Sequence, residues 1–137
     1  MIIYQTPTVT LDYNNVRHQL VQTWKGFSSS ETFREAIDKS VSFTKANQVD
    51  TILSDTLEQS VVKPEDSAYA ASVMPQLFQN GVKAMAFVMP KNVITQMSLK
   101  RFGNESKVDN VRFFSSVPEA QRWLFELGVT KTASHTH

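Results

Sequence analysis

The chain has 137 residues, of which 41% are hydrophobic and 20% charged, a balance typical of one soluble globular domain. Its 14 basic and 13 acidic residues leave a formal net charge of +1, so no overall field attracts nucleic acid or an anionic membrane. There are no cysteines, which excludes disulfides and thiolate chemistry and fits a reducing cytoplasm. Because the sequence has neither a signal-peptide pattern nor an apolar run long enough to span a membrane, we expect a cytoplasmic protein.

The N-terminal part of the chain predicts strands. Residues 2–13 contain two short runs rich in β-branched and aromatic side chains, and the second run alternates apolar and polar residues as a half-buried strand does. Asn14-Asn15 suits a turn because asparagine tolerates positive φ. The alternation resumes over residues 16–25, so we expect a β-hairpin with His18 on the surface of its second strand.

An amphipathic helix is expected after the hairpin. Ser28 and Glu31 have the spacing of a capping box, in which each side chain accepts a hydrogen bond from the other residue's free N–H. Apolar side chains then recur every three or four residues until Asn47, as on the buried face of a helix. This helix must cross the sheet to reach the apolar run of residues 49–53, which we predict to be a strand that stops at Ser54.

The next elements predict a parallel strand–helix–strand unit. After a loop over residues 55–63, Pro64 suits the first turn of a helix, and Gly81 suits its C-terminal cap. Pro75 lies inside this helix and is expected to kink it. Residues 82–89 are almost wholly apolar, which favours a strand that is covered on both faces.

The remaining elements follow the same alternation of helix and strand. We predict a third helix over residues 93–102 and a final short strand over residues 111–114. Ser116 and Glu119 have the spacing of a second capping box, which opens a last helix that ends before Gly128.

The order of the predicted elements indicates the fold class. A hairpin followed by alternating helices and strands predicts an α/β domain with a mixed sheet. We find no internal repeat or linker, so we expect residues 1–129 to form one domain and residues 130–137 to be a polar tail.

Several short segments, taken in order, form a recognisable pattern. They are Trp24-Lys25-Gly26-Phe27, residues 30–36, Ile52-Leu53-Ser54-Asp55-Thr56, Pro64-Glu65-Asp66, Ala86-Phe87-Val88-Met89-Pro90, residues 111–114 and residues 120–124. Together they cover nearly the whole domain and resemble the SpoIIAA-like branch of the STAS domain superfamily (sulfate transporter and anti-anti-sigma factor domains). The resemblance implies a mixed sheet of four to five strands with about four helices, and many members are bacterial proteins with no assigned activity.

The resemblance also bears on phosphorylation. Anti-anti-sigma members carry Asp-Ser-Ser-Gly at the start of the helix after the central strand, and a partner kinase phosphorylates the second serine. The corresponding residues here are Asp66, Ser67, Ala68 and Tyr69, so the phosphorylated serine is replaced by alanine. This substitution argues against the family's phosphorylation switch, although a phosphate on Ser67 would be tolerated by the helix dipole.

One candidate polar site lies after the strand of residues 49–53. Ser54-Asp55-Thr56 is predicted at the carboxyl end of a central strand, where open α/β sheets bind ligands, with Lys63, Glu65 and Asp66 nearby. The alternative is that these side chains only hydrogen-bond within the loop.

A second candidate site is apolar. Methionines and phenylalanines gather in the second half of the chain, among them Met74, Phe78, Met89 and Met97. Their usual role is in the core, but methionine also lines surfaces that admit apolar ligands. Separation of the kinked second helix from the third would open such a pocket.

The sequence contains no pattern of residues that requires catalysis. His18, His135 and His137 have no nucleophile and acid placed with them, and there is no phosphate loop, dinucleotide fingerprint or HExxH motif. The basic residues within 91–107 are not interleaved with aromatic side chains, which argues against a nucleic-acid surface. We therefore expect no enzyme activity, no metal and no cofactor.

Two functional hypotheses remain. The first, which the resemblance favours, is a regulatory module that binds a protein partner through the helix of residues 64–80, including Ser67 and Tyr69, and the loop of residues 55–63. The alternative is a carrier or sensor of a small apolar or lipid-like ligand that associates with membrane surfaces. Self-association as a homodimer, through the hairpin edge or the second helix, stays open.

Overall fold

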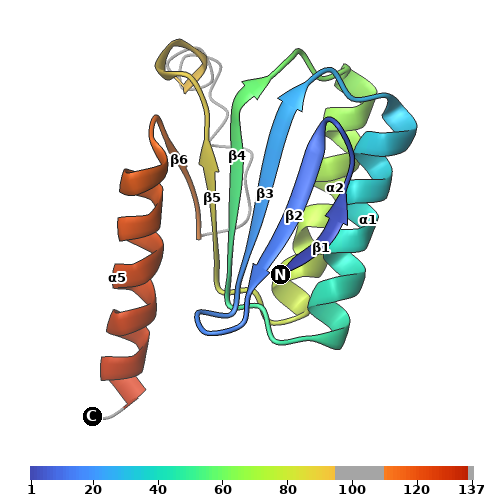
Figure 1. Cartoon of the computed structure of the whole chain (residues 1–137). Coiled ribbons are helices and arrows are strands. Elements are labelled where there is room, and N and C mark those ends of the chain that lie inside the picture. The colour runs from blue at the N-terminus through green and yellow to red at the C-terminus, as the bar shows by residue number, and fades with distance from the viewer. Residues whose placement is uncertain (95–109, 136–137) are drawn as a thin grey trace.

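The computed structural model describes residues 1–94 and 110–135, and for residues 128–135 it describes the backbone alone. Its elements form a single six-stranded sheet with helices on both faces (Figure 1). The strands are β1 (Ile2–Gln5), β2 (Val9–Asn14), β3 (Gln19–Gly26), β4 (Thr51–Gln59), β5 (Ala84–Val88) and β6 (Val111–Phe114). The longer described helices are α1 (Ser30–Ala46), α2 (Pro64–Gln79) and α5 (Val117–His135).

The strands lie side by side in the order in which they occur in the sequence, from β1 to β6. The pairs β1–β2 and β2–β3 are antiparallel, and the pairs from β3 to β6 are parallel. The predicted α/β class and mixed sheet are therefore confirmed. The expected count of four to five strands is too low, because residues 2–5 pair with β2 as an additional edge strand.

The hairpin of β2 and β3 forms as expected, with one difference at its turn. Cα pairing runs from Val9 opposite Trp24 to Asn14 opposite Gln19. The side-chain oxygen of Asn14 accepts hydrogen bonds from two backbone N–H groups in the turn, as asparagine commonly does. His18 has a left-handed backbone with φ of 52°, so it belongs to the turn and not to the strand.

Local hydrogen bonds fix the start of α1 and the end of α2. The N-cap of α1 is Ser29, whose hydroxyl accepts the N–H of Thr32, so the predicted Ser28–Glu31 capping box is wrong by one residue. At the end of α2, the N–H of Val82 bonds the carbonyl of Leu77, and Gly81 has positive φ. This is the Schellman arrangement, and both Leu77 and Val82 are buried in the core.

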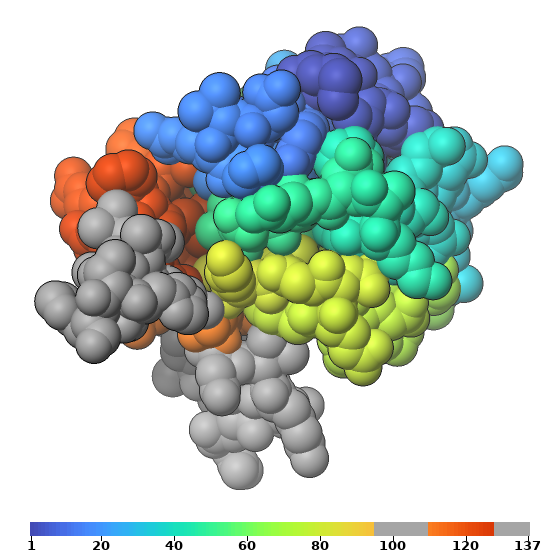
Figure 2. Space-filling model, turned by 90° about the horizontal axis from the view of Figure 1, so that it is seen from below, coloured from blue at the N-terminus to red at the C-terminus, as the bar shows by residue number. Residues whose placement is uncertain are grey.

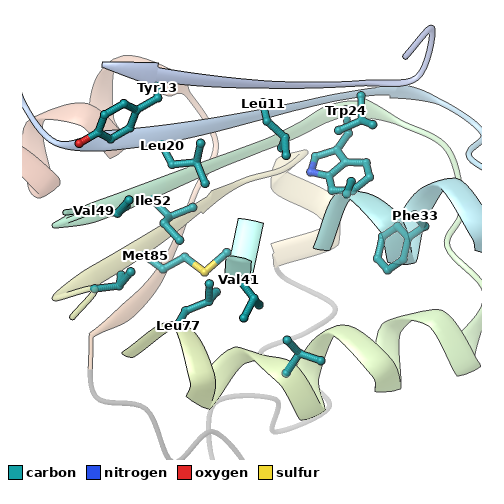
Figure 3. Close-up of a cluster of buried hydrophobic side chains, with 14 residues drawn as sticks. Leu11, Tyr13, Leu20, Trp24, Phe33, Val41, Val49, Ile52, Leu77 and Met85 are labelled. Carbon is teal, nitrogen blue, oxygen red and sulfur yellow. The ribbon is translucent and has the colours of Figure 1, made fainter. Parts of the chain in front are cut away.

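A larger core lies between the sheet and the helices α1 and α2. Figure 3 shows side chains from β2, β3, β4 and β5 directed toward these helices, with the Trp24 indole facing Phe33. The centroids of the Trp24 and Phe33 rings are 5.1 Å apart. Figure 2, seen from below, shows α1 and α2 next to each other, with α5 on the opposite side of the molecule.

A smaller core lies on the other face of the sheet, under α5. Leu53 of β4, three side chains of β5 and two residues of α5, Ala120 and Leu124, are buried together there. Because α5 packs on β4, β5 and β6, it covers this face only over the parallel half of the sheet. The sheet therefore separates two independent apolar layers.

Two predicted helix limits differ from the structure. The last helix continues past Gly128 to His135, with the hydroxyl of Ser116 accepting the N–H of Glu119 at its start as predicted. Helical structure after β5 begins at Lys91, since the N–H of Ile94 bonds the carbonyl of Pro90. The rest of the predicted third helix falls within residues 95–109, outside the described residues.

No described helix is both long and apolar enough to cross a membrane.

We predict that the α5 layer contributes strongly to stability. Leu124→Ala should lower the free energy of unfolding by about 2–5 kcal/mol, because it leaves a cavity at a buried site. Phe125→Ala is the matched control: this neighbour is 58% exposed, and its loss should cost less than about 1 kcal/mol. Urea denaturation of both variants measures the difference, and equal losses would contradict the assigned packing of α5.

Candidate functional site

The residues predicted as a polar site lie at one end of the sheet. This end, at the top of Figure 1, is where β3 and β4 finish and where α1 and α2 begin. Three large apolar side chains are exposed there: Phe27 (57%), Leu57 (39%) and Val61 (87%). We call these three residues the carboxyl-end surface.

Ser54, Asp55 and Thr56 do not form a loop, because β4 extends to Gln59. Ser54 is buried, and its hydroxyl accepts the indole N–H of Trp24 at 3.2 Å. The hydroxyl of Thr56 donates to the carbonyl of Val88 at 2.7 Å. Asp55 accepts the backbone N–H two residues further along, at 3.1 Å. These polar groups therefore hold β4 in place, and Ser54 is not accessible to a partner.

β4 projects beyond its neighbour β5. Its pairing with β5 ends at Asp55 opposite Val88, whereas its pairing with β3 continues until Gln59 lies opposite Gly26. A register shift, as at a β-bulge, lies between these points. Bulges are frequent next to functional sites because they redirect side chains, and here Leu57 is in the irregular stretch.

The loop between β4 and α2 is anchored at both ends. The N–H of Ser60 donates to the carbonyl of Gly26 at 2.9 Å, and the carbonyl of Lys63 accepts the N–H groups of Asp66 and Ser67 at 3.0 Å each. Below this loop is a small hollow of about 10 Å³. It is lined by Ser28, Phe33, residues 59–63 and Asp66.

Asp66 lies in the first turn of α2 but is only 2% exposed. One carboxylate oxygen accepts the hydroxyl of Ser30 at 2.7 Å, and the other accepts Nε–H of Arg34 at 3.0 Å. The hydrogen bond from Ser30 lowers the pKa of the Asp66 carboxyl below its ordinary value, and Arg34 adds to this effect against the opposing influence of burial. The carboxylate is therefore an internal link between α1 and α2, and not a surface group as the sequence suggested.

A second contact between the two helices follows one turn further on. The Arg34 guanidinium lies 4.8 Å from the ring centroid of Tyr69, at cation–π distance. The Tyr69 hydroxyl donates to Asp38, and this hydrogen bond, more than burial, raises the pKa of the phenol. Sequence reasoning missed the partners on α1, although Ser30, Arg34 and Asp38 are spaced four residues apart and so share one helix face.

The other predicted polar residues are at the surface. Lys63, Glu65 and Ser67 are exposed around the start of α2, and Tyr69 is half-buried. They surround the link made by Asp66, so the structure brings these predicted residues together while separating them from Ser54.

The residues of the predicted apolar pocket are not shown to line one pocket. Met74 and Phe78 are half-buried and pack against the larger core. Met89 follows β5, where its N–H donates to the carbonyl of Phe114, and Met97 lies outside the described residues. These contacts give Met74 and Phe78 a core role.

Two wider hollows occur elsewhere among the described residues. One is an open depression of about 510 Å³ over α1, lined by Glu31, Arg34, Glu35, Asp38, Lys39 and Ser42. The other, of about 420 Å³, lies near the opposite end of the sheet between the hairpin and Gln121 of α5. In the described part of the chain, no three His, Asp or Glu side chains are grouped so that they could hold a metal ion.

We predict that Asp66 makes stability depend on pH in the acid range. Its folded-state pKa lies below the unfolded value of about 4, so the stabilisation is complete above that value and is lost as pH falls through the folded pKa. In urea denaturation between pH 2 and 7, Asp66→Asn and Ser30→Ala should therefore lose less stability on acidification than the wild type. An unchanged pH dependence in both variants would contradict this assignment.

We also predict that Ser54 is needed as a buried acceptor. Ser54→Ala leaves the Trp24 indole N–H without its partner, and such a loss costs about 1–3 kcal/mol of unfolding free energy. Ser42→Ala, an exposed change on α1, should alter stability by less than about 0.5 kcal/mol. Thermal or urea unfolding compares the two variants, and equal effects would rule out this role.

The chain resembles known proteins in its structure and not in its sequence. The chain matches no family model and no curated protein sequence. It is similar to an uncharacterized protein of the DUF3478 family with a SpoIIAA-like fold from Shewanella loihica PV-4. That match has a TM-score of 0.56 and 15% identity, and it covers 85% of this chain and 92% of that one.

A second likeness is to a chain in the crystal structure of the diguanylate cyclase SiaD in complex with its activator SiaC, from Pseudomonas aeruginosa. The TM-score is 0.50 at 14% identity, and the match covers 82% of this chain and 98% of that one. At such identities the likeness establishes the fold alone. The strand order, the helices on both faces and these two matches together show that the chain has a SpoIIAA-like fold.

Proposed function

We propose that this protein is a regulatory module that acts by binding another protein and has no catalytic step of its own. The observation that carries the proposal is the carboxyl-end surface, where Phe27, Leu57 and Val61 expose apolar side chains at one end of the sheet. The other exposed large apolar side chains among the described residues belong to the N-terminus, the hairpin turn and α5: Met1, Ile2, Val16 and Phe125. A SpoIIAA-like fold is consistent with this role, since the similar complex contains an activator, SiaC, together with the cyclase that it activates.

The chemistry of the surface suits a protein partner. Exposed apolar side chains gain about 1.5–3 kcal/mol each when a partner buries them fully, and binding energy concentrates in a few such central residues. Lys63, Glu65 and Ser67 lie beside them and supply the exposed polar groups that are usual at the rim of an interface. We expect Tyr69 to lie at this rim as well.

The surface is carried by connections on a rigid scaffold. Phe27 and Val61 lie in the segments that lead from β3 to α1 and from β4 to α2, and binding residues are often found on such segments. Compared with the sequence-based hypothesis, the proposed contact includes Phe27 and no longer includes Ser54 or Asp66, which are buried. The absence of cysteine suits a partner that is met in the cytoplasm.

We predict that polar substitution of this surface weakens partner binding without unfolding the protein. Phe27→Ser and Val61→Ser should each weaken partner binding by about tenfold or more, which corresponds to roughly 1.4 kcal/mol or more. The matched control is Val16→Ser, since Val16 in the hairpin turn is 86% exposed against 87% for Val61 but lies at the other end of the sheet. Affinity capture with quantitative mass spectrometry identifies the partner, and titration of the purified partner measures the change.

Circular dichroism and thermal unfolding should be alike for the three variants, because all three replaced side chains are exposed. Equal partner binding by Val61→Ser, Phe27→Ser and Val16→Ser would contradict the proposed surface.

A further inference from the structure

Two of the exposed apolar side chains are on separate segments of the chain. Phe27 follows β3 and leads within three residues to Ser30, the first residue of α1. Val61 follows β4 and leads within five residues to Asp66, in the first turn of α2. A partner that contacts both side chains therefore depends on how these two segments are held relative to each other.

The structure links the two segments at both of their ends. At the strand ends, the N–H of Ser60 donates to the carbonyl of Gly26 at 2.9 Å. At the helix starts, the hydroxyl of Ser30 donates to Asp66 at 2.7 Å. Phe27 and Val61 lie between these two links along their respective segments.

The link between Ser30 and Asp66 is reinforced by a second donor, Arg34. The Asp66 side chain is 3% exposed, and its two oxygens have different donors, Ser30 and Nε of Arg34. Hydrogen bonds to an ionised acceptor are about twice as strong as neutral ones. Arg34 is also stacked on Tyr69 of α2, so the donor itself is held in position.

The loop that carries Val61 depends on the same residue. The carbonyl of Lys63 accepts the backbone N–H of Asp66, and the Asp66 side chain lines the hollow beneath residues 59–63. Between the anchors at Ser60 and Lys63, Val62 packs inward against the core while Val61 is directed to solvent. A shift of Asp66 would therefore move the loop together with the start of α2.

We propose that Asp66 is the positioning residue of the carboxyl-end surface: through Ser30 and Arg34 it holds Phe27 and Val61 at one separation. The importance of this separation for binding rests on the proposed function, whereas the separation itself can be measured without a partner. The carboxylate acts from the interior and makes no contact with the partner.

The absence of cysteine from the chain makes a direct test possible. Phe27→Cys and Val61→Cys, introduced together and labelled with a nitroxide, report the distance between the two segments by electron paramagnetic resonance. We expect one narrow distance distribution in this background. Adding Asp66→Asn or Ser30→Ala should broaden the distance distribution. Ser30→Thr, which keeps the hydroxyl, should leave the distribution narrow.

Asp50→Asn is the matched control. Asp50 pairs with Lys83 at 3.5 Å, next to the start of β4 and so at the opposite end of the strand from the carboxyl-end surface. This change should leave the distance distribution narrow. Hydrogen exchange of unlabelled protein gives a second readout. The hydrogen-bonded amides of Ser60, Asp66 and Ser67 should exchange about tenfold faster in Asp66→Asn, as expected when a hydrogen bond to a charged group is lost.

The outcomes separate this inference from the proposed function. An unchanged distribution and unchanged exchange in both Asp66→Asn and Ser30→Ala would overturn the positioning role. If Asp66→Asn does not fold, Ser30→Ala decides the matter alone, since it removes only one hydroxyl. A broadened distribution in variants that still bind their partner with wild-type affinity would support the positioning role and reject the carboxyl-end surface as the binding site.

Discussion

The structure depends on the burial of β4 between two helical layers. Successive side chains of a strand point to opposite faces, so Ile52 packs toward α1 and α2 while its neighbour Leu53 packs toward α5. Each layer thus has an anchor on the same strand. The strand then continues as Ser54, whose hydroxyl enters the larger core and needs a partner there. Trp24 of β3 provides this partner through its indole N–H, so the pairing of β3 with β4 is supported by side chains as well as by the backbone.

The same topology brings the starts of α1 and α2 together. Both helices follow parallel neighbouring strands, so their first turns meet at the carboxyl end of these strands. A buried carboxylate is costly unless donors satisfy it, and Asp66 has two from α1, Ser30 and Arg34. The segments just outside this satisfied polar contact expose Phe27 and Val61. A satisfied polar contact and exposed apolar side chains are thus found at the same end of the sheet, an arrangement that would suit the proposed binding of a partner.

Much of the fold could be predicted because its signals are local. The alternation of β2 and β3, the helical periodicity of α1 and the glycine after α2 each act within a few residues, and the structure contains all three features. Local signals failed to identify the N-cap of α1, because two neighbouring serines are equally suitable for this position. Ser28 and Ser29 can each cap a helix, and the choice of Ser29 accompanies a hydrogen bond from Ser28 to Thr8, which is distant in the sequence.

By itself, the sequence determined the order of the elements, the class of the fold and the absence of thiol chemistry, because composition and periodicity are sufficient for these. Only the tertiary structure decided which polar residues are inside. Ser54 and Asp66 read as surface groups because polar side chains usually are, yet both are buried. Their partners, Trp24 for Ser54 and Ser30 with Arg34 for Asp66, are some thirty residues away along the chain. No local pattern encodes such a contact; it exists only when parallel strands align and place two distant segments against each other.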